Sequence, residues 1–286
     1  MKKIFLLLGA LLCATALSGR SRMVSDSVSS KVLGQSISVN VYLPDGFDAA
    51  KGTTYPVLYL LHGLTDDHKA WPERGGIQTV LDELTGTGEA VPMVVVMPRA
   101  GDADTHRYQS GYFNVRNWSY EDFFFQELIP AVESKYRCGG AKARRAVSGL
   151  SMGGGASVAY CQRHPDMFSS CYAMSPWLDN KKNEVGMPAD KDDRLYLTGA
   201  SVREHSALDF LDKADKSTID ALRSVKWFVD CGDDDYLLHQ SMDFYSKMRA
   251  KNVKCEFRVR NGVHSWEYWH TALRFSLPFA SQNFGR

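Results

Sequence analysis

The sequence lacks a block of like charge, an internal repeat and a low-complexity tract. Its 286 residues carry a formal net charge of +1, so the charge pattern predicts no binding to nucleic acid or to an anionic membrane. No apolar run, at the N-terminus or later, is long enough to span a bilayer. What remains is an ordinary globular composition, 44% hydrophobic and 23% charged, in a chain long enough to bury a sizeable core.

Cysteine is also sparse, and its spacing fits neither a metal site nor a disulfide framework. If Cys13 is removed with an N-terminal leader, an odd number of cysteines remains, so at least one must be unpaired. These are Cys138, Cys161, Cys171, Cys231 and Cys255. We predict that they are mostly buried packing residues. The sequence indicates no metal and no other cofactor, and it leaves the oligomeric state open.

The first residues have the order of a bacterial secretory signal peptide. Lys2 and Lys3 precede an apolar run over residues 4–12, and Ala14-Thr15-Ala16 offers a small-residue cleavage site. We therefore expect residues 1–16 to be removed and the protein to be periplasmic or extracellular. A lipid anchor on Cys13 is the alternative, but the large Leu12 before it fits such a cleavage site poorly.

The remaining chain predicts an α/β fold. Strands are expected over residues 37–43, 55–61, 93–97, 146–147, 170–174, 227–231 and 255–260. Helical patterns lie between them over residues 76–84, 125–136, 151–163 and 240–251, with a last helix from His264 and a kink or restart at Pro130. This alternation predicts one domain over residues 23–286, with a mainly parallel, twisted sheet and helices on both faces. Residues 178–224 break the pattern and are expected to form an insertion over the functional site.

The chain is organised around Gly149-Leu150-Ser151-Met152-Gly153. An apolar strand leads into this stretch and a helical segment follows, which is the context of a G-x-S-x-G nucleophile elbow. The two glycines are expected because side chains there would collide with neighbouring elements. Such a turn would hold the Ser151 hydroxyl at a helix N-terminus, where partial positive charge favours an oxyanion.

Further polar residues follow other predicted strands. His62-Gly63 ends one strand, Asp233-Asp234-Asp235 follows a second, and the segment 261–264, which ends in His264, follows the last. The carboxyl ends of parallel strands form the usual ligand-binding edge of such a sheet. The order serine, acid, histidine is that of α/β-hydrolases.

These motifs resemble the esterase-D-like group of α/β-hydrolases, which includes feruloyl and acetylxylan esterases, tributyrin esterases, S-formylglutathione hydrolases and mycolyltransferases. The matching stretches are residues 59–63 with Trp71, then 127–130, 149–154, 232–237 and 262–266. The resemblance implies an α/β-hydrolase fold in which Ser151 attacks an acyl carbonyl and His264 transfers its proton. It also implies an oxyanion hole formed by the backbone N–H groups of Leu64 and Met152. For the acid that orients His264, we choose Asp235 over Asp234 and Asp233, because Asp233 follows the strand so closely that it should cap the turn.

The resemblance implies a serine esterase that releases short acyl or hydroxycinnamoyl groups from plant polysaccharide, and the N-terminal leader predicts that it is exported. The alternatives are an acyltransferase to a sugar acceptor, a broad short-chain esterase of the tributyrin type, an S-formylglutathione hydrolase and a non-catalytic binding protein. Aromatic residues near the motifs are candidates for contacts with a flat acyl group or a sugar. They are Trp71, Tyr108, Tyr112, Trp177 and Trp266.

Overall fold

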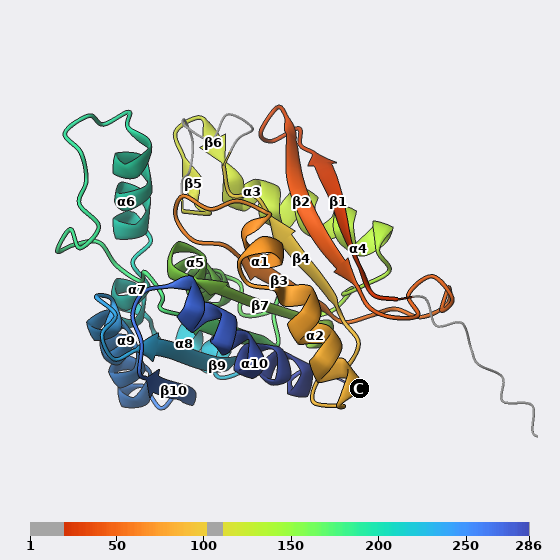
Figure 1. Cartoon of the computed structure of the whole chain (residues 1–286). Coiled ribbons are helices and arrows are strands. Elements are labelled where there is room, and N and C mark those ends of the chain that lie inside the picture. The colour runs from red at the N-terminus through yellow and green to blue at the C-terminus, as the bar shows by residue number, and fades with distance from the viewer. Residues whose placement is uncertain (1–19, 102–110, 286) are drawn as a thin grey trace, which may run out of the picture.

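The computed structural model describes residues 20–101 and 111–285, and these form a mainly parallel sheet of eight strands in the order β1-β2-β4-β3-β7-β8-β9-β10 (Figure 1). Only β2 runs in the opposite direction, antiparallel to both of its neighbours, β1 and β4. The strands are β1 (Arg22–Ser29), β2 (Ser36–Leu43), β3 (Val57–Leu61), β4 (Val94–Pro98), β7 (Arg145–Leu150), β8 (Ser170–Met174), β9 (Lys226–Gly232) and β10 (Cys255–Arg260). The predicted α/β class is confirmed. Because β4 lies between β2 and β3 in the sheet, β3 is free to pair with β7, so segments distant in the sequence lie side by side.

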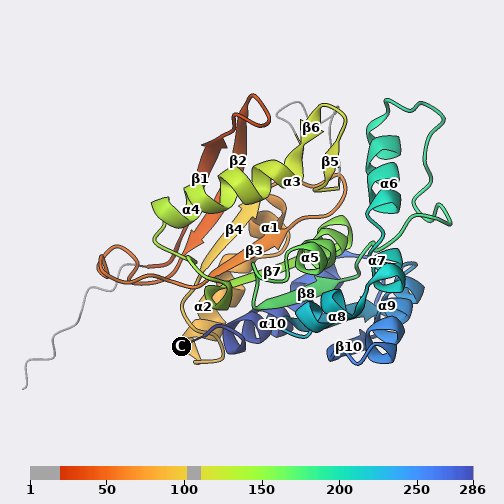
Figure 2. The same cartoon turned by 180° about the vertical axis from the view of Figure 1, so that it is seen from behind.

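Helices cover both faces of the sheet (Figures 1 and 2). On one face lie α1 (Ala70–Glu73), α2 (Ile77–Gly86) and α10 (Trp266–Gln282), and on the other lie α5 (Ser151–Arg163), α8 (Lys216–Leu222) and α9 (Leu238–Ala250). The side chains of β3 point alternately to the two faces of the sheet. Tyr59 and Leu61 belong to the core beneath α5, whereas Leu58 and Leu60 belong to the core beneath α2 and α10. A strand buried on both faces explains why residues 57–61 show no polar interruption.

The helix predicted around Pro130 is divided. A two-stranded ribbon of β5 (Asn114–Val115) and β6 (Trp118–Ser119) precedes α3 (Tyr120–Phe123), which passes through a π-helical turn over Phe124–Leu128 into α4 (Ile129–Lys135). Pro130 lies in the first turn of α4. Because proline lacks the N–H that a regular helix would use, the π turn is accommodated just before it. The predicted restart at Pro130 is therefore confirmed.

The charged segment 178–224 contains α6 (Arg194–Glu204), α7 (Ala207–Lys213) and α8. The N-cap side chains Asp193, Ser206 and Asp215 each accept a hydrogen bond from the backbone at the start of these helices. Helices α7 and α8 contribute to the core, and α6, which projects from the body of the molecule, contributes Val202 (Figure 1). Some of the polar residues that interrupt the strand-and-helix pattern of this segment thus serve as helix N-caps.

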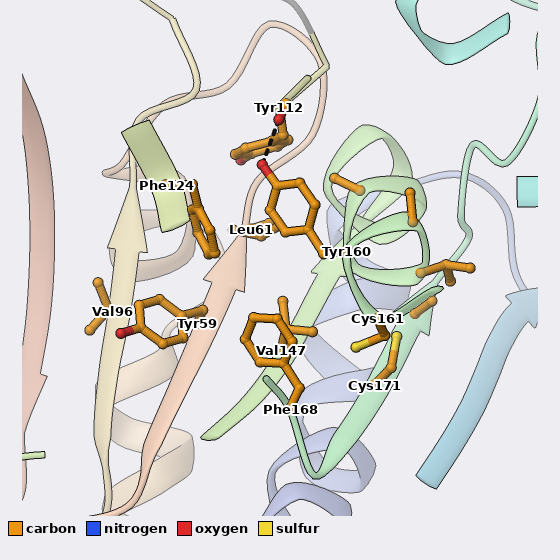
Figure 3. Close-up of a cluster of buried hydrophobic side chains, with 14 of the residues drawn as sticks. Tyr59, Leu61, Val96, Tyr112, Phe124, Val147, Tyr160, Cys161, Phe168 and Cys171 are labelled. Atoms are coloured by element: carbon orange, nitrogen blue, oxygen red, sulfur yellow. Dashed lines mark hydrogen bonds between the residues drawn. The ribbon is translucent and has the colours of Figure 1, made fainter. Parts of the chain in front are cut away.

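Figure 3 shows the core between β3, β7 and α5, where Tyr59, Phe124, Tyr160 and Phe168 pack as an aromatic cluster. The Tyr160 hydroxyl donates a hydrogen bond to the carbonyl of Tyr112. Cys161 and Cys171 lie in the same core, and all five cysteines of the described residues are buried free thiols. The prediction that they serve packing is confirmed. Across residues 20–101 and 111–285, no helix is long and apolar enough to cross a membrane.

A nearly buried ion pair connects α4 to the sheet. The Glu133 carboxylate accepts hydrogen bonds from the Arg145 guanidinium (2.8 Å), the Tyr59 hydroxyl (3.2 Å) and the Gly140 N–H (2.8 Å). The side chains of Glu133 and Arg145 are 9% and 13% exposed. Removing one partner would leave the other charge uncompensated in a site with little water.

We therefore predict that Glu133→Gln lowers the free energy of unfolding by about 3 kcal/mol. The matched control is Glu83→Gln, which breaks the pair of Glu83 with Arg274, whose side chains are 51% and 47% exposed. That control should cost less than about 1 kcal/mol. Urea denaturation followed by circular dichroism measures both, and equal losses in the two variants would contradict the prediction.

Candidate active site

The predicted elbow is present where β7 ends at Leu150 and α5 begins at Ser151. Ser151 has φ +51°, a left-handed conformation that is rare for a residue other than glycine. A Cβ at Gly149 would lie 2.5 Å from the carbonyl of Gly153, and a Cβ at Gly153 would lie 2.5 Å from the carbonyl oxygen of His62. The expected steric reason for both glycines is therefore correct, because their absent side chains allow β7, α5 and the end of β3 to meet.

The structure brings together Ser151, His264 and Asp235. His264 Nε2 lies 2.9 Å from the Ser151 hydroxyl oxygen, and Nδ1 lies 2.8 Å from the nearer carboxylate oxygen of Asp235. The Asp235 side chain is fully buried and that of His264 is 15% exposed. Burial by itself would raise the pKa of Asp235, but the hydrogen bond and charge interaction with His264 hold that pKa below its usual value.

The three adjacent aspartates have different environments. Asp233 is exposed and accepts a hydrogen bond from the Gly262 N–H at 2.8 Å, so it connects its turn to the loop after β10 instead of capping its own turn as expected. Asp234 is exposed. Asp235 points inward and also accepts from the Leu237 N–H at 2.8 Å. Of the three, Asp235 is the one whose geometry can hold the His264 ring in one tautomer.

The predicted oxyanion donors belong to two different elements. Met152 is the second residue of α5, so its N–H is among the first four of the helix, which have no carbonyl partner within the helix. Leu64 follows the His62-Gly63 turn and lines the cavity around Ser151. Leu64 therefore lies in the cavity wall that also contains Ser151, and the Met152 N–H lies at the positive end of α5.

His62 holds the turn that carries Leu64. Its Nδ1 lies 2.8 Å from the Gly63 carbonyl, and its Nε2 accepts a hydrogen bond from the Ala100 N–H at 3.0 Å. Burial lowers the pKa of His62 to about 4, so the ring is neutral, with its proton on Nδ1. The Tyr112 hydroxyl accepts from the His62 N–H at 2.8 Å and donates to its carbonyl at 3.2 Å. His62 is thus a structural turn residue.

A cavity of about 420 Å³ opens beside Ser151 and His264. Its walls combine aliphatic, aromatic and polar side chains. The lining residues are Gly63, Leu64, Thr65, Asp66, Arg74, Leu150, Ser151, Tyr236, His264, Ser265, Trp266 and Trp269. Of the aromatic residues predicted to contact substrate, Trp266 lies in this wall.

Three other aromatic predictions are wrong for this cavity. Trp71 is buried, donates its indole N–H to the Leu61 carbonyl and packs edge-on beneath Trp266. Tyr112 is fully buried against His62, and Trp177 is buried where its carbonyl closely approaches Gly155. Each of these side chains packs in the core, against neighbours that the sequence does not reveal.

Two further predictions concern the surroundings of the cavity. Tyr108 lies outside the described residues. The segment 178–224 contributes nothing to the lining of the cavity, which corrects the expectation that it forms an insertion over the site. Its helices α7 and α8 instead extend the layer that contains α5 and α9.

Sequence reasoning missed several residues of the cavity wall. Tyr236 is 52% exposed and its ring lies 4.7 Å from that of His264. Arg74 stacks on Trp266 at 5.0 Å and pairs with Asp66 at 3.0 Å. The only available signal was position, since Tyr236 directly follows Asp235 and Trp269 lies one turn beyond the His264 motif. Among the residues described, no group of three His, Cys, Asp or Glu side chains could hold a metal ion.

Known proteins are similar to this chain in sequence and in fold. A family model described as "Putative esterase" matches residues 30–280. A solved structure of a ferulic acid esterase is similar with a TM-score of 0.89 and 44% identity, over 93% of this chain and 99% of that one. An S-formylglutathione hydrolase from Staphylococcus aureus shares the fold, with a TM-score of 0.74 and 21% identity over 92% of this chain and 99% of that one.

A curated relative extends the comparison to a larger protein. The endo-1,4-beta-xylanase/feruloyl esterase of Xylanibacter ruminicola is 34% identical over 142 residues, which are 49% of this chain and 19% of that protein. The matched region thus spans less than a fifth of that relative.

The geometry predicts that Asp235→Asn lowers kcat by a large factor, up to about 10⁴, because the neutral amide neither stabilises an imidazolium nor fixes the ring tautomer. Asp234→Asn makes the same chemical change on an exposed side chain and should stay near the wild-type rate. Hydrolysis of p-nitrophenyl acetate measures both. If Asp234→Asn or Asp233→Asn collapses while Asp235→Asn retains activity, the assignment is wrong.

Proposed function

This chain belongs to the esterase family, and we propose that it is an exported enzyme releasing short acyl or hydroxycinnamoyl groups from plant polysaccharide. Membership of the family confirms the resemblance seen in the sequence and makes the chain a serine esterase, a carboxylic ester hydrolase. The observation that carries the mechanism is the hydrogen-bonded series from Ser151 through His264 to Asp235.

In the first half of the proposed reaction, the Ser151 oxygen attacks the ester carbonyl while His264 Nε2 takes the hydroxyl proton. The resulting tetrahedral oxyanion accepts hydrogen bonds from the N–H groups of Leu64 and Met152. Each such donor can lower the transition-state barrier by about 3 kcal/mol. The bond to the leaving alcohol then breaks, and the alkoxide receives the proton from His264, leaving an acyl-serine.

In the second half, water replaces the alcohol. His264 removes a proton from the water, the resulting hydroxide attacks the acyl-serine, and collapse of the second tetrahedral intermediate returns the proton to Ser151. Asp235 remains ionised throughout and compensates the imidazolium charge each time it forms. The products are the free carboxylic acid and the free alcohol.

The cavity supports a flat or compact acyl group. Tyr236, Trp266 and Trp269 supply aromatic surface within one cavity of about 420 Å³ beside Ser151, and aromatic faces suit stacking on a planar ring. The similarity to a ferulic acid esterase at 44% identity favours hydroxycinnamate esters. The similarity to S-formylglutathione hydrolase, at 21% identity, supports the fold alone.

A substrate panel with a serine-directed organophosphorus probe tests this proposal. We expect methyl ferulate, feruloylated or acetylated xylan and p-nitrophenyl acetate to be hydrolysed faster than long-chain p-nitrophenyl esters. The probe should label Ser151, and Ser151→Ala should lose several orders of magnitude in kcat and all labelling. Labelling of another serine would overturn the mechanism, whereas fastest turnover of long-chain esters would overturn the substrate class. Release of a new sugar ester in place of free ferulate would identify an acyltransferase.

Export rests on the N-terminal sequence, which lies outside the described residues. The basic, apolar and small-residue order of residues 1–16 is typical of a cleaved secretory signal. We expect the mature protein from native cells to begin just after Ala16. N-terminal sequencing measures this, and a native chain that still begins at Met1 would contradict export by this route, while a lipid-modified Cys13 would indicate anchoring.

A further inference from the structure

The segment that follows β8 lies directly against the nucleophile elbow. The Trp177 N–H donates a hydrogen bond to the Ser151 carbonyl at 2.9 Å. A Cβ at Gly155 would collide with the Trp177 carbonyl, so the backbone of this segment packs on the first turns of α5. Trp177 and Leu178 are 2% and 1% exposed. The position of the Ser151 backbone is therefore coupled to that of residues 177–179.

One buried side chain binds the next two residues of this segment. Gln240 is the third residue of α9 and is 1% exposed. Its Oε1 accepts hydrogen bonds from the N–H groups of Leu178 at 2.7 Å and Asp179 at 3.0 Å, and its Nε2 donates to the Asp179 carbonyl at 2.9 Å. An uncharged amide presents an acceptor and a donor side by side, which a carboxylate does not. Glutamine is therefore suited to hold all three backbone groups at once.

The backbone of Gln240 belongs to the turn that carries the proposed acid. Its N–H donates to the Leu237 carbonyl at 3.0 Å, and the Leu237 N–H donates in turn to the Asp235 Oδ1 at 2.8 Å. The Leu238 N–H donates to the backbone carbonyl of Asp235 at 2.9 Å. Gln240 thus connects two loops at the carboxyl edge of the sheet. Its side chain binds the loop that supports Ser151, and its backbone binds the loop that carries Asp235.

We propose that Gln240 is a positioning residue that fixes the Asp235 loop relative to Ser151, so that His264 can contact both. The inference rests on the proposed hydrolytic function. His264 lies 2.9 Å from the Ser151 hydroxyl and 2.8 Å from the Asp235 carboxylate, so a small separation of the two loops would break one of these hydrogen bonds. A displacement of about 1 Å in a catalytic group can cost a factor of about 100 in rate. Gln240 itself does not line the cavity.

Gln240→Met tests this inference, because methionine has a similar length and no amide. We expect kcat to fall by about tenfold to a hundredfold, and KM to change little, since neither Gln240 nor residues 177–179 line the cavity. The matched control is Gln162→Met. Gln162 is 2% exposed, and its Nε2 donates to the Ala207 carbonyl at 3.0 Å, at the end of α5 away from Ser151. The control should lower the melting temperature and keep kcat near that of the wild type.

Hydrolysis of p-nitrophenyl acetate gives kcat and KM, and thermal melts give the folded fraction at the assay temperature. If Gln240→Met is unfolded at that temperature, Gln240→Asn is measured in its place, with Gln162→Asn as its control. Asparagine keeps the amide but is one methylene shorter, so it cannot reach all three backbone groups. The same selective loss of kcat is then expected, by a smaller factor.

A double-mutant cycle distinguishes positioning from a general loss of packing. If Gln240 acts on the alignment of Asp235 with His264, the Gln240 substitution should cost little further kcat in an Asp235→Ala background. The two losses will then not add. A general loss of packing would lower kcat by the same factor whether or not the Asp235 carboxylate is present.

Several results would overturn the inference while leaving the hydrolytic function intact. They are wild-type kcat in the folded Gln240 variant, equal losses of kcat in the Gln240 and Gln162 variants, or additive losses in the cycle with Asp235→Ala. If Ser151→Ala or Asp235→Ala itself keeps wild-type activity in the same assay, the proposed function fails, and the inference fails with it.

Discussion

The close approach of three backbone segments is the constraint on which the site depends. The end of β7, the first turn of α5 and the carbonyls after β3 meet where Gly149 and Gly153 have no side chains. This contact forces Ser151 into its left-handed conformation and holds the hydroxyl at the end of a buried strand. A methyl group at either glycine would separate these segments, and with them the Ser151 hydroxyl and the backbone donors that face it.

Topology supplies the remaining groups. In a parallel sheet every strand delivers its following loop to one edge, and here strands β3, β7, β9 and β10 deliver the Leu64 turn, Ser151, Asp235 and His264. Residues separated by 113 positions in sequence, Ser151 and His264, therefore lie within hydrogen-bond distance. The helices on both faces bury the strands, and this leaves the edge as the place where polar side chains can meet.

The sequence was most informative where backbone requirements and residue type coincide. Continuous apolar runs located β3, β4 and β8, and the glycine spacing located the elbow, because these patterns follow from local geometry. The position of Asp235 after its strand distinguished it from Asp233 for the same reason. Aromatic side chains were different, because whether Trp71, Tyr112 and Trp177 face a cavity or the core depends on neighbours distant in sequence.

The two buried aspartates near the end of β9 show why only one of them suits acid–base chemistry. Asp230 is fully buried and accepts hydrogen bonds from the Tyr172 and Tyr268 hydroxyls and from Arg260, whose permanent charge compensates it at all times. Asp235 is paired with an imidazole, which carries charge only after it has taken a proton. In the proposed mechanism that proton comes from Ser151, so the attraction between Asp235 and His264 is strongest as the oxyanion forms. An interaction that strengthens in the transition state accelerates the reaction, whereas the permanent pairing of Asp230 stabilises only the fold.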